Sequence, residues 1–538
     1  MNASEYLLDR LADYKVDHIF GIPGDYILPF FAHAEASGIR MVTTTHEPSA
    51  GYAADAYART KGLGAAVATY GVGALNMLNA TAQAYAERSP TLFISGAPEI
   101  SGRSPDKLLH HEVKHWDTQI RAFSEMTCAA VNLVDGAKAC EQIDTVIDDV
   151  MRLKRPGYIE LPRDMQKTEV ERRRVVRTYL KRGDDFEKNL ADATSKVIGI
   201  LNGSKRPVIY AGVEIDRFGL RSELIRFAKK ANLPVATSLL GKSVFPETHP
   251  NFVGIYMGAI GSQRAREMVE NSDCVLLLGG FMTDFDSGLF TMRIPDDNLI
   301  LADASQLLVR GESFPGITLP DLMRSLLLSP GINPREPPAR QPADSKAAQP
   351  QQGSGLSAGS IIEALNGFVG DEMAVVTDVG DCLFSCVDLK VNRFLAPAFY
   401  ASVGFGVPAG LGMGLADLTR RTVVLVGDGG FQMTGVELST AKRLGINPIV
   451  IVYNDAKYGT LEAMRAGMKS FDLPVWDYSG LAKAIGCDGC AASTPQELKG
   501  ALQSALSSRV PYVIDAKLSG ARSNTLQRLG GLVGKKTA

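Results

Sequence analysis

Short apolar runs recur along this 538-residue chain, and segments with a helical spacing of apolar positions separate them. Residues 65–69, 91–95, 207–212, 423–426 and 449–453 are five such runs, each bounded by glycine, proline or polar residues. Runs of this length and composition are typical of strands in parallel sheets. Their alternation with helices predicts an α/β chain of doubly wound parallel sheets.

The chain is too long for one hydrophobic core, so we expect several domains. A charged stretch at 171–177 follows the first alternating unit, and a stretch rich in Pro, Gln, Ala and Ser at 331–356 is typical of a linker. The sequence therefore predicts a first domain at 1–168, a central domain at 190–330 and a third domain at 357–530.

A glycine-rich turn carries the strongest local indication of chemistry. The sequence Gly-Asp-Gly-Gly at 427–430 follows an apolar run and precedes a helical segment that we expect to begin near Gly435. Glycine lets backbone N–H groups approach a ligand closely, and a helix N-terminus attracts negative charge. At the carboxyl end of a parallel strand, such a turn predicts a diphosphate site. The glycines in question are Gly427, Gly429 and Gly430.

Two aspartates at neighbouring strand ends form a candidate metal site. Asp428 lies between the glycines, and Asp455 ends the next apolar run 27 residues later. With diphosphate oxygens and the carbonyl of Lys457, these carboxylates would complete the octahedral oxygen shell that Mg²⁺ requires. An aspartate at a strand end usually caps or solvates the chain, so only the pair at this spacing is informative.

This pattern, Gly-Asp-Gly followed about 27 residues later by Asn454-Asp455, resembles the cofactor motif of thiamin-diphosphate enzymes. The three expected units also match the family's order of pyrimidine-binding, central and diphosphate-binding domains. The resemblance implies bound thiamin diphosphate and Mg²⁺, with Val403 as an apolar wedge between the two rings of the cofactor. It further implies cofactor contacts at Thr69, Asp381, Ala401 and Tyr458.

Glu47 follows the apolar run at 41–45. A carboxylate at a strand end that faces an apolar cleft would have a raised pKa and could hold a proton. Its sequence context resembles that of the family's activating glutamate, which shares a proton with the aminopyrimidine of thiamin. An ordinary surface glutamate is the alternative interpretation.

Asp25 and the adjacent pair His110 and His111 point to one branch of the family. A double histidine is usually a solvated loop or a satisfied core pair. Together with Asp25, however, the pair resembles the 2-keto acid decarboxylases, most of all the phenylpyruvate and indolepyruvate type. The resemblance implies that the three side chains line the substrate side, where histidines relay a proton and an acid orients the substrate.

The chain departs from pyruvate decarboxylases at one position. Those enzymes carry a catalytic glutamate six residues after the second metal ligand, where this chain has Leu461. The neighbouring Glu462 would point about 100° away on a helix. The resemblance implies that an aspartate of the central domain serves instead. Asp284 is our candidate, and Asp286 is the alternative.

Apolar residues at the expected substrate pocket predict a large substrate. Leu383 takes the place of a tryptophan that narrows pyruvate-specific pockets, and Leu461 replaces a charged side chain. Phe281 and Met282 are expected at the same pocket. The expected reaction is the non-oxidative decarboxylation of phenylpyruvate or indole-3-pyruvate to the aldehyde and CO₂ through a thiamin-bound enamine.

Other functions stay open on sequence grounds. A carboligase or acetolactate-synthase-like enzyme would share the cofactor residues, and so would a broad aliphatic 2-keto acid decarboxylase. A sensor that binds cofactor without turnover would be expected to lose Glu47 or the metal carboxylates. No G-x-G-x-x-G follows a strand, so nothing supports a nicotinamide oxidoreductase.

Composition and charge limit the kinds of partner that this chain is expected to bind. A net charge of −2 and the absence of a polybasic segment argue against nucleic-acid binding. No apolar run reaches the roughly 18 residues of a membrane span, and the N-terminus predicts an amphipathic helix, not a signal peptide.

Seven scattered cysteines suit a reducing cytoplasm, and the C-x-x-C spacing at 487–490 is interpreted as two incidental thiols. The resemblance implies self-association to a dimer at least, with a tetramer expected, because residues of the first and third domains meet across subunits in the family.

Overall fold

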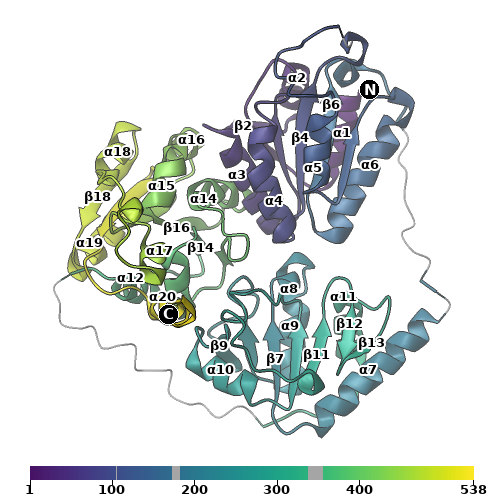
Figure 1. Ribbon diagram of the computed structural model, residues 1–538. Helices are drawn as coiled ribbons and strands as arrows, with labels where there is room; N and C mark the ends of the chain where they lie inside the picture. The colour runs from purple at the N-terminus through teal and green to yellow at the C-terminus, as the bar shows by residue number, and fades with distance from the viewer. Residues whose placement is uncertain (104–105, 173–181, 184, 337–354, 538) are drawn as a thin grey trace.

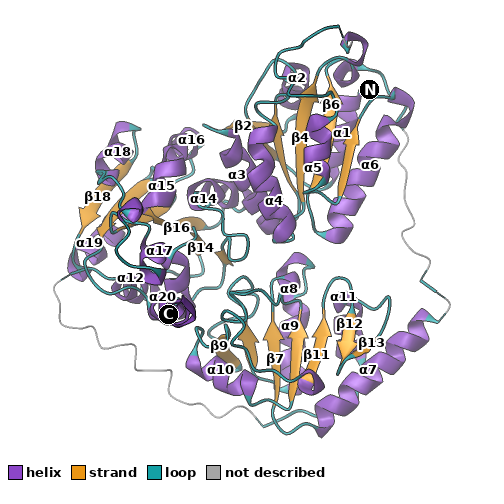
Figure 2. Cartoon of the chain, in the orientation of Figure 1, coloured by secondary structure: helices purple, strands orange, loops and turns teal. Residues whose placement is uncertain are grey.

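The computed structural model describes residues 1–103, 106–172, 182–183, 185–336 and 355–537. They form three α/β domains, each a sheet flanked by helices (Figures 1 and 2). Of the expected connector and linker, residues 173–177 and 337–354 lie outside the described part of the chain. The doubly wound class expected from the sequence is confirmed.

The first domain holds a six-stranded parallel sheet in the order β2-β1-β3-β4-β6-β5. Its central strands β3 and β4 are buried along their whole length, as their apolar composition requires. The strands are β1 His18–Gly21, β2 Arg40–Thr43, β3 Gly64–Ala68, β4 Thr91–Ala97, β5 Ala129–Asn132 and β6 Gly157–Pro162. The helices are α1 Ala3–Asp13, α2 Leu28–Ser37, α3 Glu47–Lys61, α4 Leu78–Ala86, α5 Thr118–Ser124 and α6 Gly136–Leu153.

The central domain holds a seven-stranded sheet in the order β13-β12-β11-β10-β7-β8-β9. Unlike the expected all-parallel sheet, it ends in two antiparallel edge strands, β12 and β13. A two-residue hairpin joins them, because Arg310 and Gly311 both adopt positive φ. The strands are β7 Pro207–Ala211, β8 Val235–Thr237, β9 Phe252–Ile255, β10 Cys274–Leu278, β11 Leu299–Ala302, β12 Leu307–Val309 and β13 Glu312–Ser313. The helices are α7 Phe186–Gly203, α8 Glu214–Arg217, α9 Arg221–Ala231, α10 Gln263–Glu270 and α11 Leu319–Leu328.

The third domain holds a six-stranded parallel sheet in the order β15-β14-β16-β17-β19-β18. Strands β16 and β17 are neighbours, so the residues that follow them share one edge of the sheet. The strands are β14 Met373–Thr377, β15 Phe394–Leu395, β16 Arg421–Gly427, β17 Ile449–Asn454, β18 Asp488–Ala492 and β19 Tyr512–Lys517. The helices are α12 Ala358–Asn366, α13 Asp381–Phe384, α14 Gly406–Ala416, α15 Asp428–Thr434, α16 Leu438–Arg443, α17 Gly459–Met464, α18 Tyr478–Ala484, α19 Pro495–Ser507 and α20 Asn524–Thr537.

Helices α3 and α14 join the first and third domains into one hydrophobic core (Figure 1). Their backbones approach so closely that a Cβ added at Gly412 would lie 2.0 Å from the carbonyl oxygen of Ala53. Tyr52 on α3 also packs edge-on against Phe405, with 5.7 Å between ring centroids. A glycine on α14 therefore determines how the two domains dock.

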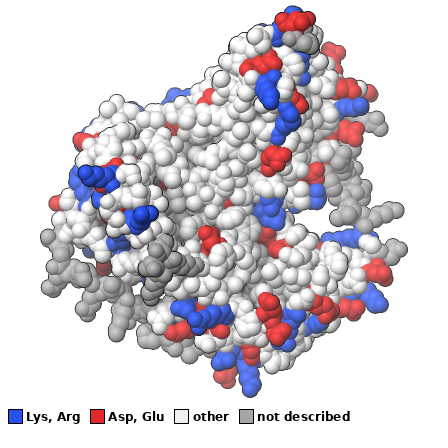
Figure 3. All heavy atoms as spheres, in the orientation of Figure 1, with Lys and Arg blue, Asp and Glu red and all other residues white. Residues whose placement is uncertain are grey.

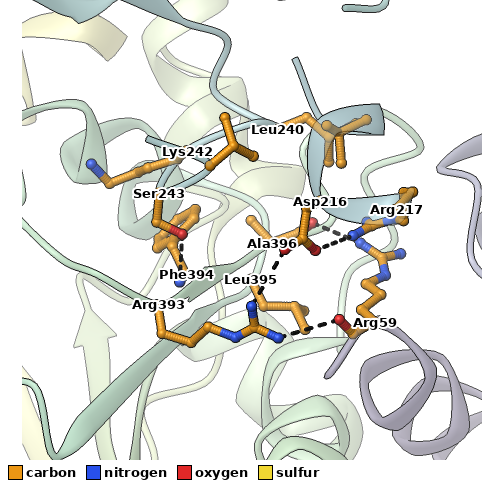
Figure 4. A pocket seen from close by; sticks show the side chains of 12 residues that line it. Arg59, Asp216, Arg217, Leu240, Lys242, Ser243, Arg393, Phe394, Leu395 and Ala396 are labelled. Carbon is orange, nitrogen blue, oxygen red and sulfur yellow. Dashed lines mark hydrogen bonds and ion pairs between the residues drawn. The ribbon is translucent and has the colours of Figure 1, made fainter. Parts of the chain in front are cut away.

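All three domains meet at a group of buried and partly buried ion pairs (Figure 4). Arg59 of the first domain donates to Glu87 at 2.7 Å, and its carbonyl accepts from Arg393 of the third domain at 3.4 Å. Asp216 of the central domain accepts from Arg217 and from Arg393. The cavity between these groups has a volume of about 20 Å³, enough for one water molecule. The junction is thus a closed polar contact.

The two cysteines with C-x-x-C spacing pack into different hydrophobic clusters. Cys487 belongs to the core shared by the first and third domains, whereas Cys490 packs against a cluster within the third domain. Both are free thiols, and burial raises the pKa of Cys487 to about 11. A buried thiol with a raised pKa is unreactive, which agrees with two incidental cysteines.

The visible surface carries mixed charge. On the face drawn in Figure 3, Lys and Arg side chains are interspersed with Asp and Glu. This distribution is consistent with the small net charge. Among the described helices, none is long and apolar enough to cross a membrane.

Candidate active site

The glycine-rich turn is the start of a helix. Strand β16 ends at Gly427, and α15 begins directly at Asp428. A helical segment does begin at Gly435, as a 3₁₀ turn at Gly435–Glu437 that leads into α16, but it is α15, not this segment, that presents its N-terminus at the turn. Gly427 takes the extended backbone of a helix N-cap, and an aspartate in the first turn is favoured by the helix dipole.

Asp428 has a buried oxygen without a partner. The residue is 2% exposed, and its Oδ1 accepts the N–H of Gly429 at 2.8 Å. Its Oδ2 is buried and makes no hydrogen bond within the described chain. Burial, followed by the charge of Asp455, raises the pKa of Asp428 to about 6. A cation between the two carboxylates would satisfy the free oxygen, so these residues fit a divalent metal.

The glycines have different local roles. A Cβ at Gly429 would lie 2.7 Å from the ring of Tyr458, and one at Gly430 would lie 3.1 Å from the carboxyl carbon of Asp378. Gly427, by contrast, has open space where a Cβ would stand. Two of the three glycines are therefore required by protein neighbours, and the backbone at Gly427 is the part that a diphosphate could approach.

The segment after β17 turns sharply beside this site. Ala456 has a φ of 53°, and the carbonyl of Lys457 accepts the N–H of Gly459 at 2.9 Å. A carbonyl has a second lone pair, so the oxygen of Lys457 can still bind a cation. The ammonium group of Lys457 lies 3.4 Å from Asp472 and 3.8 Å from Glu462.

Asp378 is a buried residue that the sequence analysis missed. It follows β14, is fully buried, and accepts N–H groups from Gly404 at 3.2 Å and Gly406 at 2.8 Å. Burial raises its pKa to about 6. The carboxylate thus fixes the loop that presents Ala401, with a φ of 61°, and Val403, which is 40% exposed. An aspartate directly after a strand was the available signal.

Asp381 begins α13 and faces the C-terminal segment. Both of its carboxylate oxygens accept the backbone N–H of Ser523 at 3.2 Å, and the Ser523 hydroxyl donates to the same group. Burial raises the pKa of Asp381. This expected cofactor residue is held by the chain itself.

Glu47 is the first residue of α3. Its Oε2 accepts from the side-chain amide of Asn76 at 2.9 Å, and the same amide lies 2.9 Å from Nε2 of His46. Two residues earlier, Thr45 donates its N–H and hydroxyl to Glu437, a fully buried residue of the third domain. Asn76 therefore holds the Glu47 side chain, and Glu437 fixes the chain two residues before it; neither was predicted from the sequence.

The structure brings Asp25, His110 and His111 together. Nε2 of His110 lies 2.6 Å from Oδ2 of Asp25, and one ligand atom from each of the three side chains lies within 4.8 Å of the others. Burial alone would raise the pKa of Asp25, but the hydrogen bond and the charge of His110 lower it. Thr69, expected at the cofactor, has its hydroxyl 3.4 Å from Asp25. The ring of Tyr26 stacks on His110.

A buried polar cluster supports the second histidine. His111 has a φ of 70°, and a Cβ at Gly71 would lie 2.2 Å from the His111 carbonyl oxygen. The N–H of Gly71 donates to Gln119 at 2.7 Å, and Gln119 donates to Glu160 at 3.0 Å. Burial raises the pKa of Glu160 to about 7. No local motif marks Gln119 or Glu160 in the sequence.

The two aspartates of the central-domain loop differ in access. Asp284 is exposed, whereas Asp286 is 3% exposed and burial raises its pKa to about 7. Of the two candidates, only Asp284 can meet a solvent-borne ligand. Phe281 contacts Phe399 of the third domain at 6.0 Å between ring centroids, and Met282 is exposed at the same loop.

Leu461 and Leu383, the two expected pocket leucines, lie in different surroundings. Leu461 on α17 is 46% exposed, and Glu462 beside it accepts the N–H of Gly467 at 3.2 Å. Leu383 is fully buried in a hydrophobic cluster at the border with the central domain. Phe281, another residue expected at the pocket, packs against the same cluster. That Leu383 lines the substrate pocket stays a prediction.

Comparison with known proteins gives consistent matches along the chain. Three family models match: the thiamine pyrophosphate enzyme N-terminal TPP binding domain at residues 1–122, the central domain at 194–308 and the C-terminal TPP binding domain at 378–516.

Curated relatives cover nearly the full length. The chain is 36% identical to an indole-3-pyruvate decarboxylase of Azospirillum brasilense over 98% of this chain and 97% of the relative. It is 34% identical to an alpha-keto-acid decarboxylase of Mycobacterium leprae, over 89% and 86%, and 32% identical to that of Mycobacterium tuberculosis, over 90% and 87%. The chain therefore belongs to the thiamin-diphosphate-dependent 2-keto acid decarboxylases, a family of carboxy-lyases.

Proposed function

We propose that this enzyme decarboxylates aromatic 2-keto acids, phenylpyruvate or indole-3-pyruvate, and releases the aldehyde and CO₂. The observation that carries the proposal is Leu461. It is 46% exposed on α17, and that helix begins beside the metal carboxylates, since a Cβ at Gly459 would lie 2.6 Å from Asp455. An exposed apolar side chain there favours an apolar substrate.

Neighbouring residues support the same substrate class. The carboxylate of Glu462, next to Leu461, is largely buried: its Oε1 lies near Gly467 and Lys457, and its Oε2 is buried without a hydrogen-bond partner among the described residues. Phe281 and Met282 add apolar surface from the central domain. The Azospirillum brasilense relative is named for an aromatic substrate, which agrees with this proposal, while the mycobacterial relatives carry the broader name.

The residues that would hold the cofactor follow from the geometry. We propose that Asp428, Asp455 and the carbonyl of Lys457 bind Mg²⁺, and that the backbone at Gly427 receives the diphosphate. Val403 would support the thiamin rings. When bound, thiamin diphosphate supplies the carbon nucleophile and the electron sink for loss of CO₂.

The chain's own side chains handle protons. We propose that Glu47 holds a proton at Oε1, since Asn76 occupies its other carboxylate oxygen. His110 and His111 would move a proton to the product while Asp25 keeps them oriented. Asp284 would take the role of the absent glutamate at position 461.

A second subunit completes this proposal. Several large apolar side chains are exposed on both the first and the third domain, and a partner subunit would cover them where they lie together. They are Leu28, Val72, Val403, Met433 and Val436. We propose a dimer as the minimal active form and a tetramer as the full assembly. The seven cysteines, which form no disulfide among the described residues, support a cytoplasmic location.

Product analysis tests this function. The enzyme with thiamin diphosphate and Mg²⁺ is incubated with phenylpyruvate, indole-3-pyruvate, a branched aliphatic 2-keto acid and pyruvate, and CO₂, aldehyde and acyloin are quantified separately. The proposal expects stoichiometric CO₂ and aldehyde, with the highest yield from aromatic acids. Acyloin as the main product would instead identify a carboligase.

A further inference from the structure

The C-terminal segment reaches the candidate metal site. Arg522, two residues before α20, donates from Nη1 to Oδ2 of Asp455 at 2.8 Å. The guanidinium group passes so close to the backbone that a Cβ at Gly459 would lie 2.1 Å from the same nitrogen. Both side chains of the pair are partly exposed, Arg522 at 26% and Asp455 at 21%. A glycine at the start of α17 is thus what admits the arginine.

The next residue reaches a second expected cofactor residue. Ser523 is buried and donates both its N–H and its hydroxyl to Asp381. The Ser523 hydroxyl also accepts the N–H of Leu526 at 3.3 Å, as an N-cap of α20 does. Two consecutive residues therefore bind two different carboxylates, and both carboxylates belong to the proposed cofactor site.

Helix α20 is itself anchored away from that site. Leu526 and Leu529 are fully buried in the cluster at the border of the central and third domains. Arg528 donates to the carbonyl of Gly261 in the central domain at 2.6 Å. Gly530 packs against α17, where a Cβ would lie 2.4 Å from the carbonyl of Ala463. Figure 1 shows α20 between these two domains.

We infer that Arg522 and Ser523, which directly precede the C-terminal helix, are positioning residues of the metal and diphosphate site, so that these two contacts contribute to retention of the cofactor. A carboxylate has two oxygens, and Arg522 holds Oδ2 of Asp455, which leaves Oδ1 for a cation. Hydrogen-bond partners that orient a metal ligand strengthen metal binding, and their loss typically costs roughly 10- to 100-fold in affinity. The inference rests on the proposed function of Asp455.

A second effect of Arg522 acts in the opposite direction. A positive charge near a cation site weakens cation binding, so removal of the arginine could in principle tighten it. The pair lies at a partly solvated edge, where solvent and salt screen the repulsion between Arg522 and a bound cation. Screening does not reduce the effect of losing the fixed orientation of Asp455. Orientation therefore decides the sign, and we expect weaker binding in its absence.

The test is titration of metal-depleted full-length protein with Mg²⁺ in the presence of saturating thiamin diphosphate, followed by calorimetry. Arg522→Ala should raise the Mg²⁺ dissociation constant by roughly 10-fold or more. Arg522→Lys, which keeps the charge and one donor, should recover part of the loss. Ser523→Ala should raise the dissociation constant of thiamin diphosphate at saturating Mg²⁺.

Arg528→Ala is the matched control, because it loosens the same helix without touching either carboxylate. It should lower the thermal midpoint and leave the Mg²⁺ dissociation constant within about twofold. If Arg522→Ala does not fold, Arg522→Gln is measured by the same criterion. Unchanged or tighter Mg²⁺ binding in the arginine variants overturns the inference alone, whereas a wild-type protein that binds neither Mg²⁺ nor thiamin diphosphate overturns the proposed function as well.

Discussion

Asp25 and His110 are 85 residues apart in the chain, yet Oδ2 of one lies 2.6 Å from Nε2 of the other. Burial works against ionisation of Asp25, but the hydrogen bond and charge of His110 lower its pKa. Asp25 is therefore a carboxylate at neutral pH, and its oxygen lies within hydrogen-bond distance of the adjacent imidazole. This pairing is what a proton relay requires at its donor end.

Replacement of either histidine should slow turnover and spare the cofactor. His110→Ala and His111→Ala are expected to lower kcat by roughly 10²- to 10⁴-fold, the usual contribution of proton transfer. The dissociation constants of Mg²⁺ and thiamin diphosphate should stay unchanged. Tyr26→Phe is the control, because it keeps the ring stacked on His110 and removes only the hydroxyl 3.2 Å from Nδ1. Unchanged kcat in both histidine variants would contradict the relay.

Glu47 and Asp428 should have separable effects. Glu47→Gln is expected to lower kcat by orders of magnitude while leaving diphosphate anchoring intact, because the lost function is proton sharing. Asp428→Ala should abolish Mg²⁺-dependent retention of cofactor during purification, since it removes the buried free oxygen. Cofactor content and kcat are measured on both variants. Full activity of Glu47→Gln would refute the proton-sharing role of Glu47. Full cofactor occupancy of Asp428→Ala without Mg²⁺ would refute the metal site.

The accessible aspartate of the central domain should matter more than the glutamate beside Leu461. Asp284 is exposed, while Glu462 is engaged by Gly467 and Lys457. Asp284→Asn is therefore expected to reduce kcat/KM by at least tenfold more than Glu462→Gln. Steady-state kinetics with phenylpyruvate decides between them, and the reverse order would move the catalytic role to Glu462.

Glu160 predicts a specific dependence of stability on pH. Burial raises its pKa from 4.5 to about 7, so the folded protein keeps a proton that the unfolded chain releases between these values. Its contribution to stability therefore falls as the pH rises from about 4.5 to 7, by on the order of 3 kcal/mol. Glu160→Gln cannot ionise and should lack this loss. The thermal midpoint of the variant, compared with that of the wild type, should be more favourable at pH 8 than at pH 5. The same difference between the two proteins at both pH values would contradict a buried, protonated Glu160.

The close approach of α3 and α14 predicts that only glycine is tolerated at position 412. Gly412→Ala places a methyl group 2.0 Å from the Ala53 carbonyl, so the helices must separate, at a cost of about 1 to 3 kcal/mol. Gly199→Ala on α7 is the matched control, since nothing lies within 4 Å of its Cβ position and alanine favours a helix. The thermal midpoint should fall in the first variant and hold or rise in the second.

The fold class followed from local periodicity, and the structure shows why. Runs such as 65–68, 423–427 and 449–454 are buried strands because their apolar residues leave no other stable arrangement. The start of α15 at Asp428 was misplaced because two glycines in its first turn suggest a loop. Glycine is favoured at both positions because Tyr458 and Asp378, which are distant in sequence, lie where the Cβ atoms of Gly429 and Gly430 would stand.

The candidate site likewise contains residues that could be predicted from the sequence and residues that could not. Asp428, Asp455, Glu47, Asp25 and the histidines could be named because they stand in short motifs. Others could not be named, because they act through long-range hydrogen bonds that no local pattern records: Arg522, Glu437 and Gln119. The burial of Leu383 was not predicted, because motif position does not reveal which side of a single-turn helix faces the core.

The most direct test of the central claim is the ratio of kcat/KM for phenylpyruvate or indole-3-pyruvate to that for pyruvate. Burial of about 100 Å² more apolar surface than pyruvate's methyl group offers would contribute about 2 to 3 kcal/mol. The aromatic acids should therefore exceed pyruvate by at least about tenfold, and Leu461→Glu should narrow the ratio. An enzyme that uses pyruvate as well as, or better than, both aromatic acids would contradict the account.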